Sequence, residues 1–160
     1  MLRVNIICIG KIKEKYFTDA VSEYSKRLGA FCRCKVVELS PVKLPDNPSA
    51  AQITAALNRE AAMIREKIPK GAAVFALCIE GRTLTSEQFS ERLQAAAVAG
   101  GADVAFLIGS SFGLDEDLKK AANYRLSMSP MTFPHQLARV MLLEQIYRAF
   151  QIASGGKYHK

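Results

Sequence analysis

Two residues near the end of the chain, His135 and Arg139, have the types and spacing for proton transfer and anion binding. They are four residues apart, so in a helix they share one face. An imidazole at a helix start is disfavoured as a cation and can accept a proton, whereas a guanidinium can stabilise a developing anion or bind a phosphate. Both also have simpler interpretations. His135 could be a hydrogen-bonded helix-start residue, and Arg139 could form an ion pair with Glu144 or another neighbour.

The segment just before this pair contains two prolines, Pro130 and Pro134. Each proline fixes its own φ and disfavours helix at the preceding residue, so the sequence predicts a rigid loop over residues 129–133. Rigid loops can present backbone amides to a ligand. Pro134 itself suits the first turn of the helix that follows.

The rest of the chain alternates between strand-like and helix-like patterns, with glycine or proline at many boundaries. Apolar, β-rich runs predict strands, while helical spacing and Ser/Thr capping boxes predict helices. Strands are expected at 2–9, 33–39, 73–79, 103–108 and 124–128, and helices at 14–28, 49–68, 85–99, a short stretch after 115, and 137–153. This order has no linker or repeat and predicts one α/β domain, with a parallel sheet flanked by helices on both faces.

Three short loops follow the carboxyl ends of predicted strands, where open α/β sheets bind their ligands. They are Glu80-Gly81, the glycine loop 109–113 and residues 128–133. The glycine loop lets a ligand approach the backbone, but it lacks the lysine of a P-loop and the spacing of a dinucleotide fingerprint. An ordinary turn without a ligand could have the same kind of sequence. Glu80 is either a ribose contact or a solvated strand end, and the sequence does not separate the two.

Composition narrows the class of protein. The net charge is +7, from 22 Lys and Arg against 15 Asp and Glu, and 49% of residues are hydrophobic. Such a basic balance is typical of chains that approach polyphosphates, although basic proteins without that role share it. The chain has no apolar run long enough for a membrane span or a signal peptide, so we expect a cytoplasmic protein without a membrane partner. The four cysteines lack zinc or redox spacing, so no metal site is expected.

The last helix pattern is apolar on several sides and leaves only a narrow polar stripe at Glu144, Arg148 and Gln151. A helix of this kind packs against more than its own sheet, so an obligate homodimer is expected. Residues 155–160 are expected to leave the helix as a flexible basic tail containing Tyr158 and His159.

Taken together, these residues closely resemble the SPOUT-class ribosomal RNA large subunit methyltransferase H family. The resemblance covers nearly the whole chain. It is carried by Gly10-Lys11, Glu14-Lys15-Tyr16, Glu23-Tyr24, Lys26-Arg27-Leu28, Gly81, Ser86-Glu87, Ser127, Ser129, the run Met131 to Gln136, Arg139, Glu144-Gln145, Tyr147-Arg148-Ala149 and Tyr158-His159-Lys160. One departure concerns the glycine loop, because the family usually has two adjacent glycines where this chain has Gly109 followed by Ser110.

The resemblance implies a single SPOUT domain over residues 1–160, with a trefoil knot and dimer interface at about 103–154 and a basic tail at 155–160. It implies S-adenosylmethionine as cofactor and N3 of a pseudouridine in large-subunit rRNA, within the assembled ribosome, as methyl acceptor. The implied cofactor contacts are Leu77, Gly109, Met128, Ser129, Pro130, Met131, Thr132 and Phe133. The implied catalytic residues are His135, Arg139, Tyr158 and His159, the last two completing the site of the partner subunit.

Methyl transfer from a sulfonium is one in-line displacement, which needs alignment and exclusion of water but no metal. Two other classes remain open from the residues alone. One is a non-catalytic RNA-binding or ribosome-associated module, favoured by the basic charge but lacking a recognised RNA-binding signature. The other is a nucleotide-binding oxidoreductase on an ordinary open sheet, which the missing fingerprint disfavours.

Overall fold

The computed structural model describes residues 1–160 and contains five helices and five strands, with all the strands in one sheet. The strands are β1 (Leu2–Ile9), β2 (Cys32–Leu39), β3 (Ala73–Thr83), β4 (Asp103–Ile108) and β5 (Tyr124–Ser127). The helices are α1 (Lys15–Leu28), α2 (Ala50–Lys67), α3 (Ser86–Ala99), α4 (Glu116–Ala121) and α5 (His135–Ala153). All strand pairs are parallel, in the order β2-β1-β4-β3-β5. The predicted order of elements and the parallel sheet are therefore confirmed.

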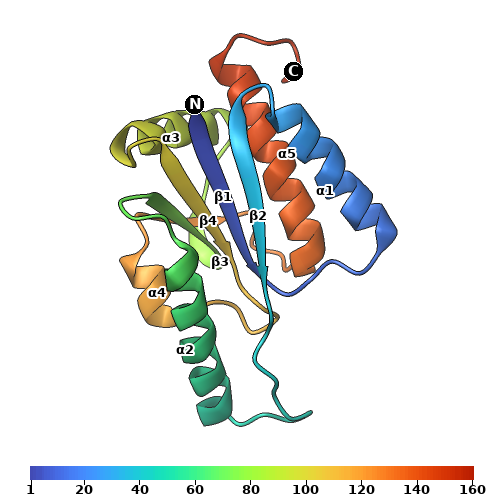
Figure 1. Cartoon of the computed structure of the whole chain (residues 1–160), viewed down its shortest axis with the longest axis vertical. Helices are drawn as coiled ribbons and strands as arrows, with labels where there is room; N and C mark the ends of the chain where they lie inside the picture. Colours follow the sequence, from blue (N-terminus) through green and yellow to red (C-terminus); the bar gives the residue numbers. More distant parts are fainter.

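Helices cover both faces of the sheet. On one face, α5 packs against α1 and α3 (Figure 1), over a core that includes Phe75, Phe106 and Leu142. On the other face α2 and α4 cover a second core, which includes Ile64 and Leu118. The central strands β1 and β4 are largely buried, which accounts for their continuous apolar sequences. None of the helices combines the length and apolar character needed to cross a membrane.

Local side-chain contacts account for the helix starts. Ser49 with Gln52 and Thr85 with Gln88 each form the reciprocal contacts of a capping box, as predicted. At α4 the Asp115 carboxylate accepts a hydrogen bond from the Leu118 amide.

Two boundaries differ from the prediction by two residues or more. Strand β3 continues beyond Ile79 to Thr83, because a register shift lets its last residues pair again with β5. Gly81 permits this shift, since a Cβ there would lie 2.8 Å from the Arg125 backbone. Helix α5 begins at His135, so Pro134 is its N-cap and lies just outside the first turn.

Candidate active site

A cavity of about 640 Å³ lies beyond the carboxyl ends of β3, β4 and β5, at the edge of the sheet where a ligand was predicted. Its volume falls within the range of small-molecule sites. The cavity brings together most of the predicted site residues, namely Leu77, Gly109, Met128, Ser129, Met131, Thr132, Phe133 and His135. We call it the loop cavity.

Four predicted site residues do not line the loop cavity. Pro130 is exposed outside it, and Arg139 is buried within the domain with 1% of its surface accessible. Tyr158 and His159 lie against the far part of α5 in the same chain. Within one chain, therefore, only His135 among the predicted catalytic residues reaches the cavity.

The glycine loop forms the tightest wall of the cavity. The Gly113 amide donates a hydrogen bond of 2.8 Å to the Ser110 carbonyl, and Gly113 has a φ of +88° that suits glycine. A Cβ at Gly109 would overlap the Gly113 carbonyl group. The shape of this loop therefore requires both glycines. The sequence alone did not distinguish such a loop from a plain turn.

The loop before α5 is held by its own serines. The Ser127 hydroxyl donates to the Ser129 carbonyl at 3.1 Å, and the Met131 amide donates to the Ser129 hydroxyl at 3.0 Å. Ser127 is buried, so this contact is shielded from water. Hydrogen bonds thus add to the two prolines in fixing the predicted rigid loop.

Three large apolar side chains around the loop cavity are exposed to solvent. Ile79, Phe112 and Met131 are 50%, 47% and 72% exposed, and all three line the cavity. Apolar groups gathered around a concave site favour a ligand with flat or apolar parts, because covering them removes apolar surface from water. The roles of Ile79 and Phe112 could not be predicted from the sequence, because their exposure depends on the fold.

His135 lies at the start of α5, where it lines the loop cavity. Burial, followed by the positive charge of Arg139, lowers the pKa of His135 from its ordinary value of 6.5. The imidazole is therefore neutral at pH 7 and has a nitrogen available to accept a proton. This agrees with the proton-accepting character predicted from its position at a helix start.

Arg139 lies one turn further along α5 and ties it to the ends of β1 and β2. Its guanidinium donates to the Glu38 carboxylate at 2.6 Å and to the Gly10 carbonyl at 3.1 Å. Glu38 also accepts a hydrogen bond from the Ile12 amide. The partner of Arg139 is thus Glu38 rather than Glu144, and its contacts place Arg139 behind His135 instead of in the cavity.

Two charged residues of the cavity wall pair with each other across 39 positions of sequence. Lys119 of α4 contacts the Glu80 carboxylate at the end of β3 and the Glu116 carboxylate one turn earlier. The hydrogen bond from Lys119 is the main cause that lowers the pKa of Glu80, which is therefore ionised at pH 7. Lys119 itself is largely buried in this pair.

Ser110, the residue that departs from the family pattern, has its hydroxyl turned towards α2. It donates to the buried Glu60 carboxylate at 3.2 Å, and Glu60 also accepts from the Val42 amide at 3.0 Å. Glu60 therefore joins the glycine loop to the proline-rich segment after β2. This role of Glu60 could not be predicted from the sequence, because a carboxylate within a helix pattern normally indicates a solvated face.

Replacing Ser110 with alanine should lower the free energy of unfolding by about 1 kcal/mol, because the Glu60 carboxylate then loses a buried hydrogen bond. Urea unfolding followed by circular dichroism measures this change. Ser111→Ala is the control, since Ser111 is exposed and its hydroxyl has no partner within the chain. Equal losses in the two variants would contradict the assigned contact.

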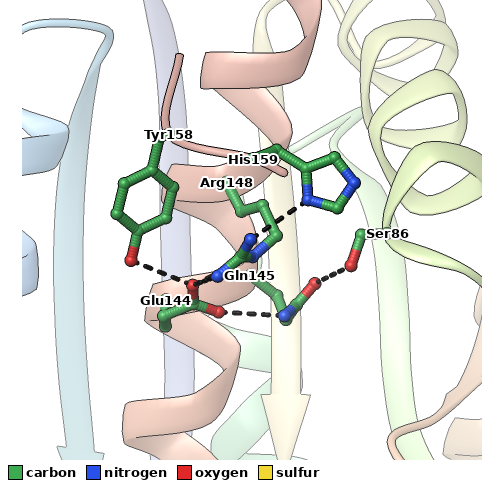
Figure 2. A network of polar contacts seen from close by, with 6 residues as sticks. All are labelled: Ser86, Glu144, Gln145, Arg148, Tyr158 and His159. Atoms are coloured by element: carbon green, nitrogen blue, oxygen red, sulfur yellow. Dashed lines mark hydrogen bonds and ion pairs between the residues drawn. The ribbon is translucent and has the colours of Figure 1, made fainter. Parts of the chain in front are cut away.

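The C-terminal residues contact α5 and α3, in contrast to the flexible tail expected from the sequence. Figure 2 shows the contacts of Tyr158 and His159 with α5. The Tyr158 hydroxyl donates to Glu144 at 3.1 Å, and Glu144 also pairs with Arg148. His159 lies 3.0 Å from Arg148 through Nδ1 and 2.7 Å from Glu87 through Nε2. Because a guanidinium only donates, Nδ1 must accept and Nε2 must carry the proton. Burial raises the pKa of Tyr158 to about 12, so its hydroxyl stays protonated.

The sequence and the fold of this chain agree with a known class of enzyme. A family model described as "Predicted SPOUT methyltransferase" matches residues 2–159, and the chain belongs to this family. A solved structure, of a probable methylase family protein from Haemophilus influenzae Rd KW20, has the same fold with a TM-score of 0.53 at 13% identity. The similarity covers 95% of this chain and 66% of that one.

Full-length relatives narrow the class further. The protein named ribosomal RNA large subunit methyltransferase H from Streptococcus equi subsp. zooepidemicus is 46% identical over 159 residues, which cover 99% of this chain and 100% of the relative. Proteins of the same name from Leuconostoc mesenteroides and Clostridium botulinum (strain Kyoto / Type A2) are 46% and 45% identical over the same length. The resemblance stated from the residues is therefore confirmed at the level of the family.

Proposed function

We propose that this chain is an S-adenosylmethionine-dependent methyltransferase that modifies N3 of a pseudouridine in large-subunit ribosomal RNA, on the assembled ribosome in the cytoplasm. One observation carries the proposal. The loop cavity gathers seven of the eight predicted cofactor residues, all except Pro130, at one edge of the sheet. The names of the full-length relatives support the choice of substrate class.

The residues of the loop cavity fit such a cofactor. Backbone groups of the glycine loop and of residues 128–133 would hold its polar parts, and the exposed side chains of Ile79, Phe112 and Met131 would cover its apolar parts. When bound, the sulfonium supplies the methyl group. The protein aligns the methyl donor with the acceptor nitrogen and excludes water from the site.

The acceptor nitrogen carries a proton that must leave, and we infer that His135, which lines the loop cavity, accepts it. Its lowered pKa keeps the imidazole neutral at pH 7, so a ring nitrogen can take the proton. Arg139 acts through His135, because its charge favours the neutral imidazole and its contacts fix the first turn of α5. Tyr158 and His159 would contribute to the site of a partner subunit, Tyr158 as a hydrogen-bond donor.

The proposal includes a homodimer and the trefoil knot implied by the family. A second cavity, of about 450 Å³, lies over α5 and is lined by apolar residues such as Val140, Met141 and Phe89. It shares Leu126 and Met128 with the loop cavity, so a second copy covering it would lie next to the cofactor loops. Sedimentation at micromolar concentrations should show a dimer, and full activity from a strict monomer would contradict this part.

The decisive experiment is a methyl-transfer assay on ribosomes from a strain that lacks this protein, with the modified base identified by mass spectrometry. We expect one methyl group on a pseudouridine of the large subunit, and weak transfer to protein-free RNA. Calorimetry with S-adenosylmethionine distinguishes the alternatives. No affinity would favour a non-catalytic RNA-binding module, and a tightly retained nicotinamide or flavin would favour an oxidoreductase.

Removing residues 156–160 should abolish methyl transfer and leave cofactor affinity nearly unchanged, because Tyr158 and His159 lie outside the loop cavity of their own chain. Single-turnover assays and calorimetry measure the two quantities. Lys157→Ala is the control, since no partner within the chain engages its ammonium group. Loss of cofactor binding in the truncated chain would make the tail structural instead.

The acid limb of the pH profile of kcat/KM should lie below pH 6.5. Burial and the charge of Arg139 lower the pKa of His135, so the proton-accepting neutral form persists below its ordinary value. For the same reason His135 costs no stability well above pH 6.5, and its destabilising effect grows as the pH falls from 6.5 to the lowered pKa, below which it stays constant. His135→Gln should remove this limb, and a limb that survives the substitution would exclude His135 as the base.

A further inference from the structure

Three arginines from three different elements line one continuous depression outside the loop cavity. Arg82 of β3 and Arg92 of α3 line both of two adjoining hollows, of about 340 and 360 Å³, and Arg125 of β5 lines the larger one. We call this the arginine surface. It lies along the β5 edge of the sheet, since Tyr124 to Leu126 of that strand form its floor.

The positive charge of the arginine surface is not neutralised within the chain. Neither an ion pair nor a side-chain hydrogen bond engages any of its three guanidinium groups, although seven other basic residues of the chain are paired with carboxylates. Glu80 also lines the larger hollow, but it is paired with Lys119. One unpaired carboxylate, Glu91, lines the smaller hollow. The surface thus has a net positive charge.

One of the three guanidinium groups is held in place by aromatic packing. Arg92 lies over the ring of Tyr124 at 5.1 Å, and Tyr124 stacks on Phe75 with ring centroids 4.5 Å apart. Because both contacts cover Tyr124, this ring offers little face for stacking a nucleic-acid base. The surface is therefore suited to anionic groups rather than to bases.

The arginine surface is continuous with the loop cavity. Glu80 and Leu126 line both of them. Arg125 precedes Met128 of the cavity wall by three residues, a separation of about 10 Å along an extended chain. A nucleotide with its base in the loop cavity would therefore bring the neighbouring phosphates of its own strand close to these arginines.

We propose that the arginine surface binds backbone phosphates of the RNA strand on one side of the target nucleotide. This inference rests on the proposed function. Guanidinium groups bind phosphate oxygens through paired N–H donors, which favours a phosphate backbone over other anions. Such contacts position the strand without reading its sequence. The surface would thus set which way the RNA strand enters the site.

The test compares two double variants with equal loss of charge. Arg82→Gln with Arg125→Gln removes two exposed members of the arginine surface, while Arg33→Gln with Arg59→Gln removes two exposed, unpaired arginines elsewhere. Binding to ribosomes lacking the modification is measured as a function of salt. The first variant should bind about tenfold or more weakly at low salt, and its plot of log affinity against log salt should be shallower by about two. The control should stay within about twofold of the unmodified protein.

Three outcomes would overturn the proposal. The first is equal behaviour of the two double variants. The second is a loss of affinity for ribosomes that is absent with protein-free large-subunit RNA, since the surface would then contact a ribosomal protein. The third is an equal loss of S-adenosylmethionine affinity, which would show damage to the loop cavity. Failure of the proposed function is distinguishable, because binding is measured without methyl transfer. An unmodified protein that binds ribosomes and transfers no methyl group would refute only the activity.

Discussion

Gly109→Ala is expected to weaken cofactor binding about 100-fold in a chain that still folds. The added Cβ would overlap the carbonyl group of Gly113, so the glycine loop must open or shift. Displacing this wall of the loop cavity by overpacking costs about 3 kcal/mol. If the whole of this cost applies to the cofactor-bound state, the affinity for the cofactor falls about 100-fold. Calorimetry with S-adenosylmethionine measures the affinity, and circular dichroism establishes that the variant is folded.

Gly71→Ala is the matched control for this prediction. Gly71 has a φ of +78°, so an alanine there is strained, but a Cβ would meet nothing within 4 Å. It should destabilise the fold by about 1 kcal/mol and leave the affinity unchanged. If Gly109→Ala binds the cofactor as tightly as Gly71→Ala does, the glycine loop is not part of the binding site.

The second large effect is expected from Arg139→Met. The substitution removes a buried guanidinium that contacts Glu38 and Gly10, so the free energy of unfolding should fall by about 3 kcal/mol. It also removes the positive charge next to His135, so the pKa of His135 should rise and the acid limb of kcat/KM should move to higher pH. A purely structural arginine would change stability and leave the limb in place.

Glu38→Gln separates the two effects of Arg139. Burial tends to raise the pKa of Glu38, but hydrogen bonds from Arg139 and the Ile12 amide outweigh it and lower the pKa below 4.5. The ionised carboxylate therefore stabilises the fold above pH 4.5, and this stability is lost as the pH falls through the lowered value. Glu38→Gln should remove that dependence while keeping Arg139 near His135. An acid limb that moves equally in both variants would contradict the role of the Arg139 charge.

Most of the fold could be predicted from the sequence because its signals are local. Continuous apolar runs identified the buried strands, and the Ser49 and Thr85 capping boxes identified two helix starts that the structure confirms. The end of β3 was missed, since its second pairing with β5 depends on a register shift that no periodic pattern reports. Local patterns set the elements, whereas tertiary pairing sets where they stop.

The same distinction between local signals and tertiary contacts applies to the candidate site. The loops that line the cavity were predicted, because strand ends in a parallel sheet meet at one edge. The partners of the charged residues were not, since Arg139 pairs with Glu38 across 101 positions and Ser110 with Glu60 across 50. Polar contacts between residues so distant in sequence leave no spacing pattern. The placement of Tyr158 and His159 against α5 was missed for the same reason.

The position of β1 inside the sheet, with a strand paired on each side, constrains how the chain is made. β1 pairs on one side with β2, which follows soon after it, and on the other side with β4, about one hundred residues later. Contacts between such distant segments slow folding, and an unpaired strand edge can join the wrong partner. During synthesis, one edge of β1 stays unpaired until residue 108 has left the ribosome. The nascent chain must therefore avoid aggregation through this edge until β4 can pair with it.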